Sequence, residues 1–410
     1  MKNPRFKYIN VAVLLVSIIL SFCIVEIYVR WAGSYDIDGN FYFRNRQLKP
    51  YRLPIKSIDQ DAEKILKNEG SFYLQYDPYT GWGIGKKIKA SNGPYISNSL
   101  GIRSQNTEQE FSEKPHKLRI ALFGDSFTHG DEVPYESTWA YLLEKNLNNA
   151  GLDVEVMNFG VCGYGFDQAY LRWLTKGIKF SPDIVVLGFV SIDVQRAVNI
   201  FRFLLTPRSN FPFSKPRYVL SGDDLKLVNS PAMSPKEVAK TLNSPDKSEI
   251  LKYEYYYNAD DYQDKFWRRS KFVSLFSFTL NDLMSKYESQ AMPSEDYMGI
   301  DSEAAKLSLR IISEFGKSVK ANKARFLIVT LPQPRDLRYF QKRSKLEYAD
   351  ILTALKQRHD VICAEERLLD VYKAKGVGSL FMERGHYTPP GHKIVADIVS
   401  QYLIKTYNIK

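Results

Sequence analysis

The sequence contains few cysteines, the residues that form disulfide bonds and bind metal ions in small secreted domains. Only three cysteines occur among its 410 residues, and their spacing forms no repeated framework. Cys23 lies in an apolar N-terminal run. Cys162 and Cys363 lie in segments that we expect in the core, where free buried cysteine is common. The sequence therefore predicts neither a disulfide framework nor a metal site, and we expect no cofactor.

Motifs for binding nucleic acid are also missing, although the chain is basic. Its formal net charge is +11 at pH 7, but the lysines and arginines are scattered along the sequence. Such a pattern indicates general surface charge, which suits a membrane surface or an anionic polymer as a neighbour. We therefore predict no nucleic-acid partner. The apolar fraction of 44% and the charged fraction of 25% are those of a globular protein.

The N-terminus is almost entirely apolar from Ile9 to Trp31 and follows a short basic stretch. This length is enough for one transmembrane helix, and the basic flank favours a cytoplasmic N-terminus. No small-residue site for signal cleavage follows the run, and the bulky Phe22 before Cys23 excludes a lipoprotein site. We expect residues 1–33 to form an uncleaved tip and anchor that crosses the bilayer through residues 9–31. The main domain would then be periplasmic or extracellular.

The remaining chain divides into a polar N-terminal part and a larger α/β part. Residues 34–116 alternate turn signals with strand-like stretches, which predicts a linker and a small β annex. Trp82 in this part could stack on a sugar, but core packing is the simpler explanation for a single tryptophan. Residues 117–410 alternate strand and helix patterns, except at 196–299. That interval is too long for a loop, so we expect an inserted, partly helical cap.

One stretch organises the α/β part. Leu118–Phe123 is a short apolar run without proline or glycine, typical of a buried strand, and Gly124-Asp125-Ser126 follows it. A hydroxyl in this place lies at the carboxyl end of a parallel sheet, where open α/β folds bind ligands. We predict a three-layer α/β/α sandwich with a parallel, flavodoxin-like sheet of about five strands, in which Leu118–Phe123 is central.

A second motif stands before the last predicted helix. It contains Glu383 and His386, followed by Gly391 and an apolar helical pattern. Together with Gly-Asp-Ser, this arrangement resembles the SGNH (GDSL-type) hydrolase superfamily, and the whole chain resembles a membrane-anchored bacterial member. The resemblance implies Ser126 as nucleophile, His386 as base and Glu383 as the orienting acid. Asp193 and Asp370 remain alternatives for the acid. His392 is the rival histidine, which more simply packs or faces solvent, and His129 would lie at the pocket edge.

The resemblance also implies an oxyanion hole. Its donors would be the backbone N–H groups of Ser126 and Gly163, the latter in the segment Asn158-Phe159-Gly160-Val161-Cys162-Gly163. Related enzymes add an asparagine side chain, but Ile192 stands in the matching position. Isoleucine cannot donate a hydrogen bond, so Ser191, Gln195 or a residue of the cap would have to replace it.

Three functions follow from this pattern. The first is an extracytoplasmic serine esterase that removes acyl groups, foremost O-acetyl, from a cell-surface or exported glycan. The second is an O-acyltransferase that uses the same serine. The third is a glycan-binding scaffold that has lost catalytic competence together with the third donor. We favour the esterase, with an acylated glycan or another ester as its substrate.

Overall fold

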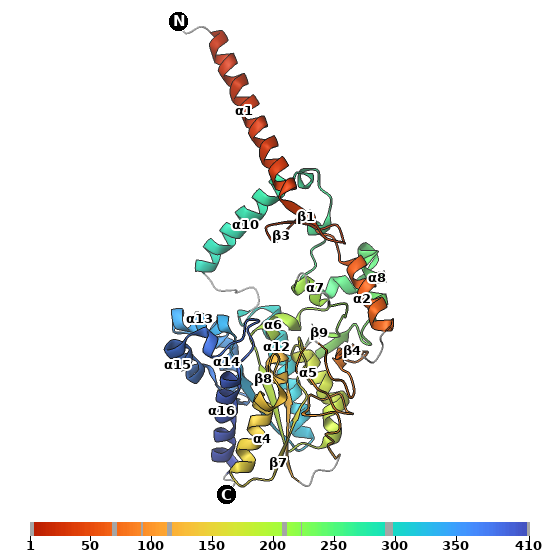
Figure 1. The fold of residues 1–410 in the computed structure, drawn as a ribbon, viewed down its shortest axis with the longest axis vertical. Coiled ribbons are helices and arrows are strands. Elements are labelled where there is room, and N and C mark those ends of the chain that lie inside the picture. Colours follow the sequence, from red (N-terminus) through yellow and green to blue (C-terminus); the bar gives the residue numbers. More distant parts are fainter. Residues whose placement is uncertain are drawn as a thin grey trace.

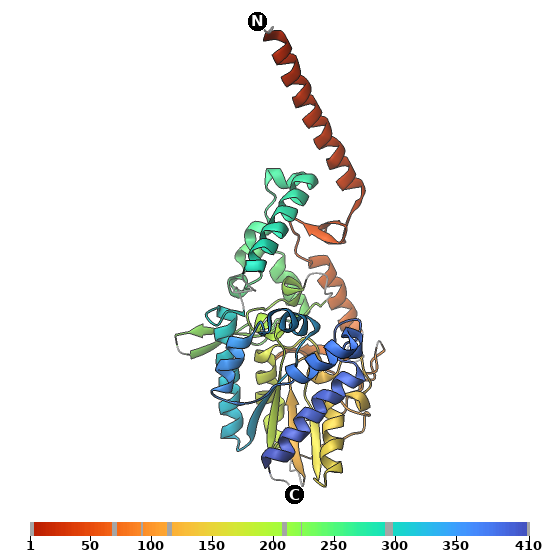
Figure 2. The same ribbon diagram turned by 90° about the vertical axis from the view of Figure 1, so that its left-hand side faces the viewer.

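The computed structural model describes residues 4–67, 72–91, 93–112, 117–206, 211–222, 224–291 and 298–407. Its long helix α1 (Pro4–Trp31) projects from one end of the molecule, and the C-terminus lies at the opposite end (Figures 1 and 2). Between them lie a group of short elements next to α1 and a larger α/β body.

A five-stranded parallel sheet forms the centre of the body. Its strands are β6 (Leu118–Phe123), β7 (Val154–Asn158), β8 (Ile184–Phe189), β11 (Arg325–Thr330) and β12 (Asp360–Ile362). They lie in the order β12-β11-β8-β6-β7, and each neighbouring pair is parallel. This is the flavodoxin-like order, so the predicted fold class is confirmed. The prediction that β6 is central was wrong, because β8 takes the middle position.

Successive side chains of a strand point to opposite faces of the sheet, so each strand contributes to two core clusters. On β6, Ile120 and Leu122 join one core cluster, whereas Ala121 and Phe123 join the other. The first cluster includes side chains of α4 (Trp139–Asn149), α13 (Pro334–Arg343), α15 (Glu365–Lys375) and α16 (Pro389–Tyr407). The second includes those of α5 (Phe166–Arg172), α12 (Glu303–Ala321) and α14 (Ala349–Lys356). Two helical layers thus enclose the sheet.

The carboxyl edge of the sheet faces the short elements next to α1 (Figure 1). Helix α16 begins shortly after His386 and runs toward the C-terminus at the far end of the body (Figure 1). The short helices α3 (Ser126–His129) and α6 (Ile192–Ala197) follow β6 and β8 at the same edge. Ser126 and His386 therefore lie on the side of the body that faces α1.

The described part of residues 196–299 interrupts the α/β alternation. They contain α7 (Arg202–Leu205), the antiparallel hairpin of β9 (Arg217–Ser221) and β10 (Asp224–Val228), α8 (Pro235–Leu242), α9 (Ala259–Tyr262) and α10 (Lys271–Ala291). Helices α7, α8 and α10 lie between α1 and the body in Figure 1. Helix α2 (Ile55–Lys67) packs on α8, so the N-terminal part and the insertion share a small core.

The N-terminal part contains two separate small sheets. β1 (Gly33–Tyr35), β2 (Phe41–Phe43) and β3 (Arg46–Leu48) form a meander beside the end of α1. β4 (Leu74–Asp77) and β5 (Gly81–Ile84) form a hairpin. Trp82 on β5 is 1% exposed, packs against Tyr164, and donates its indole N–H to the carbonyl of Cys162 at 3.0 Å. A core role, rather than sugar stacking, therefore explains this tryptophan.

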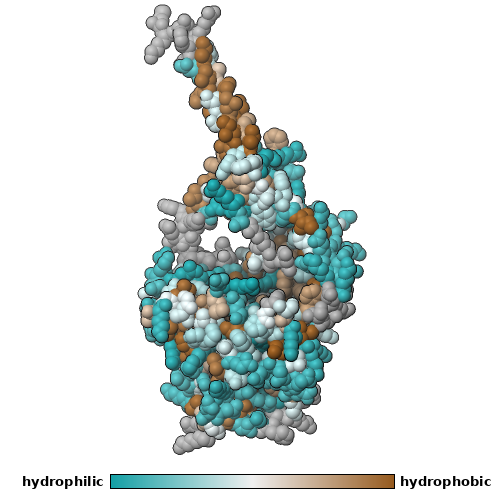
Figure 3. Space-filling model, viewed as in Figure 1, coloured by the Kyte–Doolittle hydropathy of each residue, from teal (hydrophilic) through white to brown (hydrophobic). Residues whose placement is uncertain are grey.

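Helix α1 is long and apolar enough over Tyr8–Trp31 to cross a membrane, a test that a signal sequence would also pass. Its side chains form a hydrophobic stalk, in contrast to the largely hydrophilic surface of the body (Figure 3). The C-terminal end of α1 is joined by hydrogen bonds to the insertion, residues 196–299. Glu26 accepts from the backbone N–H groups of Lys271 (3.1 Å) and Phe272 (2.8 Å). It thereby satisfies orphan donors in the first turn of α10.

We predict that Glu26→Ala loosens the first turn of α10. Loss of a helix cap costs about 1 kcal/mol, so amide exchange at Phe272 should accelerate about fivefold. Hydrogen–deuterium exchange of the full chain in detergent micelles would measure this change. Glu63→Ala is the matched control, because its side chain is 67% exposed and lies on α2. Equal exchange at Phe272 in the two variants would contradict the role of Glu26.

Candidate active site

The candidate nucleophile lies in a sharp turn at the end of β6. Gly124 has φ +152°, and an added Cβ would lie 2.4 Å from Oγ1 of Thr128. Only glycine fits this close approach, which lets the chain turn at once into α3. Ser126 is the first residue of α3 and is only 4% exposed.

A buried charge network holds this turn. Asp125 accepts a hydrogen bond from the backbone N–H of Phe127 (2.8 Å), and its other oxygen lies 2.9 Å from Nη1 of Arg196. The same nitrogen donates to Asp193 (2.7 Å) and to the carbonyl of Tyr164 (2.9 Å). Burial and the nearby charge of Asp125 raise the pKa of Asp193 well above its usual value. Arg196 thus joins three loops at the carboxyl edge of the sheet.

The candidate base meets the serine directly. Nε2 of His386 lies 2.9 Å from Oγ of Ser126, within hydrogen-bonding distance. His386 belongs to a tight turn in which its carbonyl accepts from the N–H of Met382 (2.8 Å), and Gly385 has φ +91°. The predicted proximity of Ser126 and His386 is therefore present in the structure.

The carboxylate at the other histidine nitrogen differs from the expectation. Oε2 of Glu132 lies 2.7 Å from Nδ1 of His386, whereas Glu383 is exposed at the tip of the turn. The expectation that Glu383 meets this nitrogen was wrong, because the turn that presents His386 leaves Glu383 facing solvent. The alternatives do not take its place: Asp193 binds Arg196, and Asp370 is exposed on α15.

Glu132 is held by residues far away in the sequence. Its backbone has φ +70°, an uncommon conformation for a residue with a side chain, and its N–H donates to the hydroxyl of Tyr95 (2.9 Å). Arg103 donates to the carbonyl of the following Val133 (2.9 Å), and its guanidinium lies 4.8 Å from the centre of the Tyr95 ring. Arg103 is 1% exposed. The segment before β6 therefore positions the carboxylate.

The sequence carried a weak signal for Glu132. Asp131 and Glu132 follow Gly130 six residues or fewer after Ser126, so two carboxylates stand close to the nucleophile in the chain. Their roles differ in the structure: Asp131 binds His129, with 2.5 Å between Oδ1 and Nδ1, and only Glu132 reaches His386. The number of intervening residues does not distinguish the two, since the choice depends on how the turn is twisted.

Two other histidines lie buried near the site. His129 is 1% exposed, so it is not the pocket-edge residue that we expected. Its Nε2 lies 2.8 Å from the hydroxyl of Tyr73, and burial lowers its pKa. His392 is fully buried, and its Nδ1 accepts from the N–H of Trp139 (3.3 Å). Burial lowers the pKa of His392 to about 3, so this side chain is neutral near pH 7.

The predicted oxyanion donors are the backbone N–H groups of Ser126 and Gly163. The N–H of Ser126 is at the first position of α3, where it has no acceptor within the helix. Gly163 has φ +78°, and its carbonyl accepts from Nη1 of Arg202 (3.1 Å). An added Cβ on Gly163 would lie 2.9 Å from that nitrogen. Arg202 therefore positions the Gly163 peptide. The positive φ at this position favours glycine.

The expected substitutes for a third side-chain donor are partly occupied. Oγ of Ser191 lies 2.9 Å and 3.0 Å from the two carboxylate oxygens of Asp336. Burial raises the pKa of Asp336 to about 6. Ser191 is thus bound to the first turn of α13, while Ile192 packs at the edge of the core. Gln195 is 7% exposed and stays a candidate for the donor.

The arrangement suits proton transfer from a hydroxyl. Glu132 can orient the His386 ring and stabilise it when it is charged, so that Nε2 accepts the proton of Ser126. The Ser126 and Gly163 N–H groups can stabilise negative charge on a carbonyl oxygen under attack. Within the described ranges, no group of three His, Cys, Asp or Glu side chains is placed to hold a metal ion.

Comparison with protein-family models and with curated proteins found no match. Solved structures with a similar fold were found. The acetyl xylan esterase AlAXEase is 14% identical, with a TM-score of 0.38 over 70% of this chain and all of its own. A member of the lipolytic protein G-D-S-L family from Veillonella parvula is 11% identical, with a TM-score of 0.35 over 71% of this chain and 99% of its own. TesA is 12% identical, with a TM-score of 0.35 over 70% and 97%. Similarity at this level does not establish a shared family or activity.

We predict that Arg196→Met destabilises the protein by about 3–5 kcal/mol at pH 7, because it leaves the Asp125 and Asp193 carboxylates buried without their cation. The variant removes the cation beside Asp193 and so raises the pKa of that carboxyl further in the folded state, and its stability should fall as pH rises above the unfolded value near 4. Urea unfolding of the full chain at pH 5 and pH 8 should show the larger deficit at pH 8. The exposed Arg358→Met is the control and should stay within about 0.5 kcal/mol of the parent. A deficit that does not depend on pH would contradict the charge argument.

Proposed function

We propose that this chain is an extracytoplasmic serine esterase that removes acyl groups, foremost O-acetyl, from a cell-surface or exported glycan. The observation that carries the proposal is the continuous connection from Ser126 Oγ through the His386 ring to Glu132. Such a connection activates a hydroxyl, which is otherwise a weak nucleophile. The proposed catalytic residues are Ser126, His386 and Glu132, with Glu132 in the role first expected for Glu383.

The reaction would proceed in two halves. Ser126 attacks the ester carbonyl, His386 takes the serine proton, and the N–H groups of Ser126 and Gly163 stabilise the oxyanion. His386 then gives the proton to the departing sugar oxygen, which leaves an acyl-serine. In the second half, His386 takes a proton from water while the water oxygen attacks the acyl carbon; His386 then returns this proton to Ser126 Oγ as the bond to the acyl group breaks, and the acid leaves. No metal or cofactor enters these steps.

The arrangement of the molecule supports a place at the membrane. We propose that residues 1–33 form the cytoplasmic tip and the anchor, that 34–116 form a linker and annex, and that 117–410 form the hydrolase-like domain with 196–299 as its cap. The helix Tyr8–Trp31 has the required length and hydropathy. Because Ser126 and His386 lie on the side of the body that faces α1, the substrate would react between the bilayer and the body.

The absence of the asparagine donor at position 192 sets an expected limit on the rate. Removing one oxyanion donor typically costs about 3 kcal/mol, or a hundred- to thousandfold in kcat. Ile192 supplies no donor, and Ser191 is bound to Asp336. The assembled connection between Ser126, His386 and Glu132 nevertheless argues for catalysis over a purely glycan-binding scaffold. We therefore expect a slow esterase.

Two carboxylate variants separate the alternatives for the orienting acid. With 4-nitrophenyl acetate as substrate, we expect Ser126→Ala to abolish cleavage, because it removes the nucleophile. Glu132→Gln should lower kcat about 10²- to 10⁴-fold, since the amide cannot stabilise the charged imidazole. Glu383→Gln should stay within about twofold of the parent, because Glu383 faces solvent. Equal losses in Glu132→Gln and Glu383→Gln would contradict the proposed role of Glu132, and full activity of Ser126→Ala would contradict the serine mechanism.

The acceptor of the acyl group distinguishes an esterase from an O-acyltransferase that uses the same serine. We expect free acetate to account for nearly all the acetyl lost from 4-nitrophenyl acetate in the presence of xylohexaose, because water resolves the acyl-serine. Quantification of acetate and mass spectrometry of the saccharide would measure both products. Acetylated xylohexaose as the main product would replace the esterase by the transferase.

A further inference from the structure

A large cavity lies between the β1–β3 sheet and the body, and Ser126 is not among the residues that line it. It has a volume of about 890 Å³, and we name it the neck cavity. Two stretches of the chain supply its lining: the N-terminal part from the β1–β3 meander into α2, and the insertion, with residues from α7, Phe211, 256–262 and α10. Its size lies within the range of small-molecule sites.

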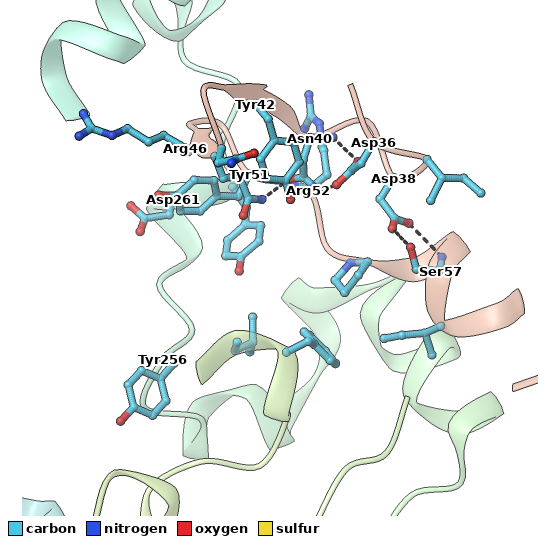
Figure 4. Close-up of a pocket in the computed structure, with 18 of the residues that line it drawn as sticks. Asp36, Asp38, Asn40, Tyr42, Arg46, Tyr51, Arg52, Ser57, Tyr256 and Asp261 are labelled. Atoms are coloured by element: carbon cyan, nitrogen blue, oxygen red, sulfur yellow. Dashed lines mark hydrogen bonds between the residues drawn. The ribbon is translucent and has the colours of Figure 1, made fainter. Parts of the chain in front are cut away.

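Aromatic side chains supply much of the lining. In Figure 4, Tyr42 and Tyr51 lie in the upper part of the view, near the β1–β3 sheet, and Tyr256 lies below the open space. The Tyr51 and Tyr262 rings meet edge to face, with 6.0 Å between their centres. Burial raises the pKa of Tyr51, so its hydroxyl stays protonated and can both donate and accept hydrogen bonds.

The polar side chains of the cavity are held in place. Asn40 is 3% exposed; its amide nitrogen donates to Asp36 at 3.1 Å, and its oxygen accepts from Gln47 at 2.6 Å. Asp38 accepts from the hydroxyl and the N–H of Ser57 at the start of α2 (Figure 4). Each carboxylate has further lone pairs that can accept hydrogen bonds from hydroxyl groups. The lining is therefore organised before a ligand arrives.

The charges around the cavity favour a neutral ligand. Four carboxylates and two guanidiniums line it: Asp36, Asp38, Asp61, Asp261, Arg46 and Arg52. Asp261 is paired with Lys49 and Asp61 with Lys64, so four positive side chains face the four carboxylates; the Arg46 guanidinium lies 5.3 Å from the centre of the Phe278 ring. This balance offers no surplus of positive charge to hold a phosphate or a polyanion. The faces of the aromatic rings instead fit the CH faces of sugar rings. The hydroxyl, amide and carboxylate groups beside them fit the sugar hydroxyls.

The cavity adjoins the candidate active site through one wall. Phe203 and Leu204 of α7 and Phe211 line it. The guanidinium of Arg202, also on α7, lies 5.8 Å from the centre of the Phe211 ring and donates to the carbonyl of Gly163. The residues that form the wall are thus neighbours of the proposed oxyanion donor.

We propose that the neck cavity binds a neutral oligosaccharide segment of the ester substrate, at a distance from the reacting acyl group. The proposal rests on the proposed esterase function for the identity of the ligand as substrate. Sugar rings stack on Tyr51 and Tyr262, and their hydroxyls bind the Asn40 and Asp36 side of the cavity. Binding there keeps a glycan chain close to Ser126 between successive cleavages.

A binding experiment tests the cavity directly. Full-length Ser126→Ala protein in lipid nanodiscs is titrated by calorimetry with xylohexaose, cellohexaose and hexagalacturonate. We expect at least one of the two neutral hexasaccharides to bind more tightly than hexagalacturonate. Adding Tyr51→Ala should weaken that binding about fivefold or more, since an aromatic contact is lost. Tyr79→Ala is the matched control, because Tyr79 is 61% exposed and lies on the β4–β5 turn.

Three binding outcomes would overturn the proposal. They are no binding of either neutral hexasaccharide, tighter binding of hexagalacturonate, and an equal effect of Tyr51→Ala and Tyr79→Ala. Thermal unfolding of each variant shows whether it is folded. If Tyr51→Ala unfolds, the conservative Asn40→Asp is measured instead, since it converts the donating amide of the cavity to an acceptor and should also weaken saccharide binding.

A kinetic experiment tests the link to catalysis. The ratio of kcat/KM for acetylated xylohexaose to kcat/KM for 4-nitrophenyl acetate should fall about fivefold in Tyr51→Ala and stay constant in Tyr79→Ala. A constant ratio in both variants would contradict a substrate role for the cavity. If the parent cleaves neither ester but Ser126→Ala still binds a neutral hexasaccharide through Tyr51, the esterase proposal fails and the saccharide site stands.

Discussion

The buried bridge made by Arg196 is the interaction on which the candidate site depends. One guanidinium nitrogen contacts Asp125 after β6, Asp193 after β8 and the carbonyl of Tyr164 after β7. These three segments emerge at the point where the order of the sheet reverses, and without a shared partner their carboxylates would repel each other in a buried setting. The bridge therefore fixes the turn that presents Ser126 relative to the segment that presents Gly163.

Support for the histidine and its carboxylate comes from outside the α/β core. Arg103 and Tyr95, in the annex before β6, hold the turn that carries Glu132. Residues of the described range 93–112 thus support the site. Glu26 binds the N-terminus of α10, so α1 and the insertion are also joined. Contacts therefore connect α1 to the insertion, and the insertion, which lines the neck cavity, continues to the body.

The division of labour among the titratable groups follows burial. His392 and His129 are buried and have lowered pKa values, which keeps them neutral as packing and hydrogen-bonding groups near pH 7. His386 is partly exposed, between Ser126 and Glu132, where a charged imidazole has a carboxylate beside it. Proximity to the nucleophile in the sequence is therefore a poor guide to function here, since His129 is only three residues from Ser126.

The sequence alone determined the elements whose signal is local. The apolar run of β6, the Gly-Asp-Ser turn and the β–α alternation predicted the sheet, its parallel pairing and the position of Ser126 at its carboxyl edge. The motif with Glu383 and His386 before the last helix predicted His386 through its resemblance to a known family. These features depend on the period of a strand or on the backbone freedom of glycine, which neighbouring residues reveal. Only the tertiary structure decided that Glu132 rather than Glu383 faces His386, that β8 is central, and that distant tyrosines enclose the neck cavity. Each of these depends on how turns and segments far apart in the chain pack together, and no local pattern records that packing.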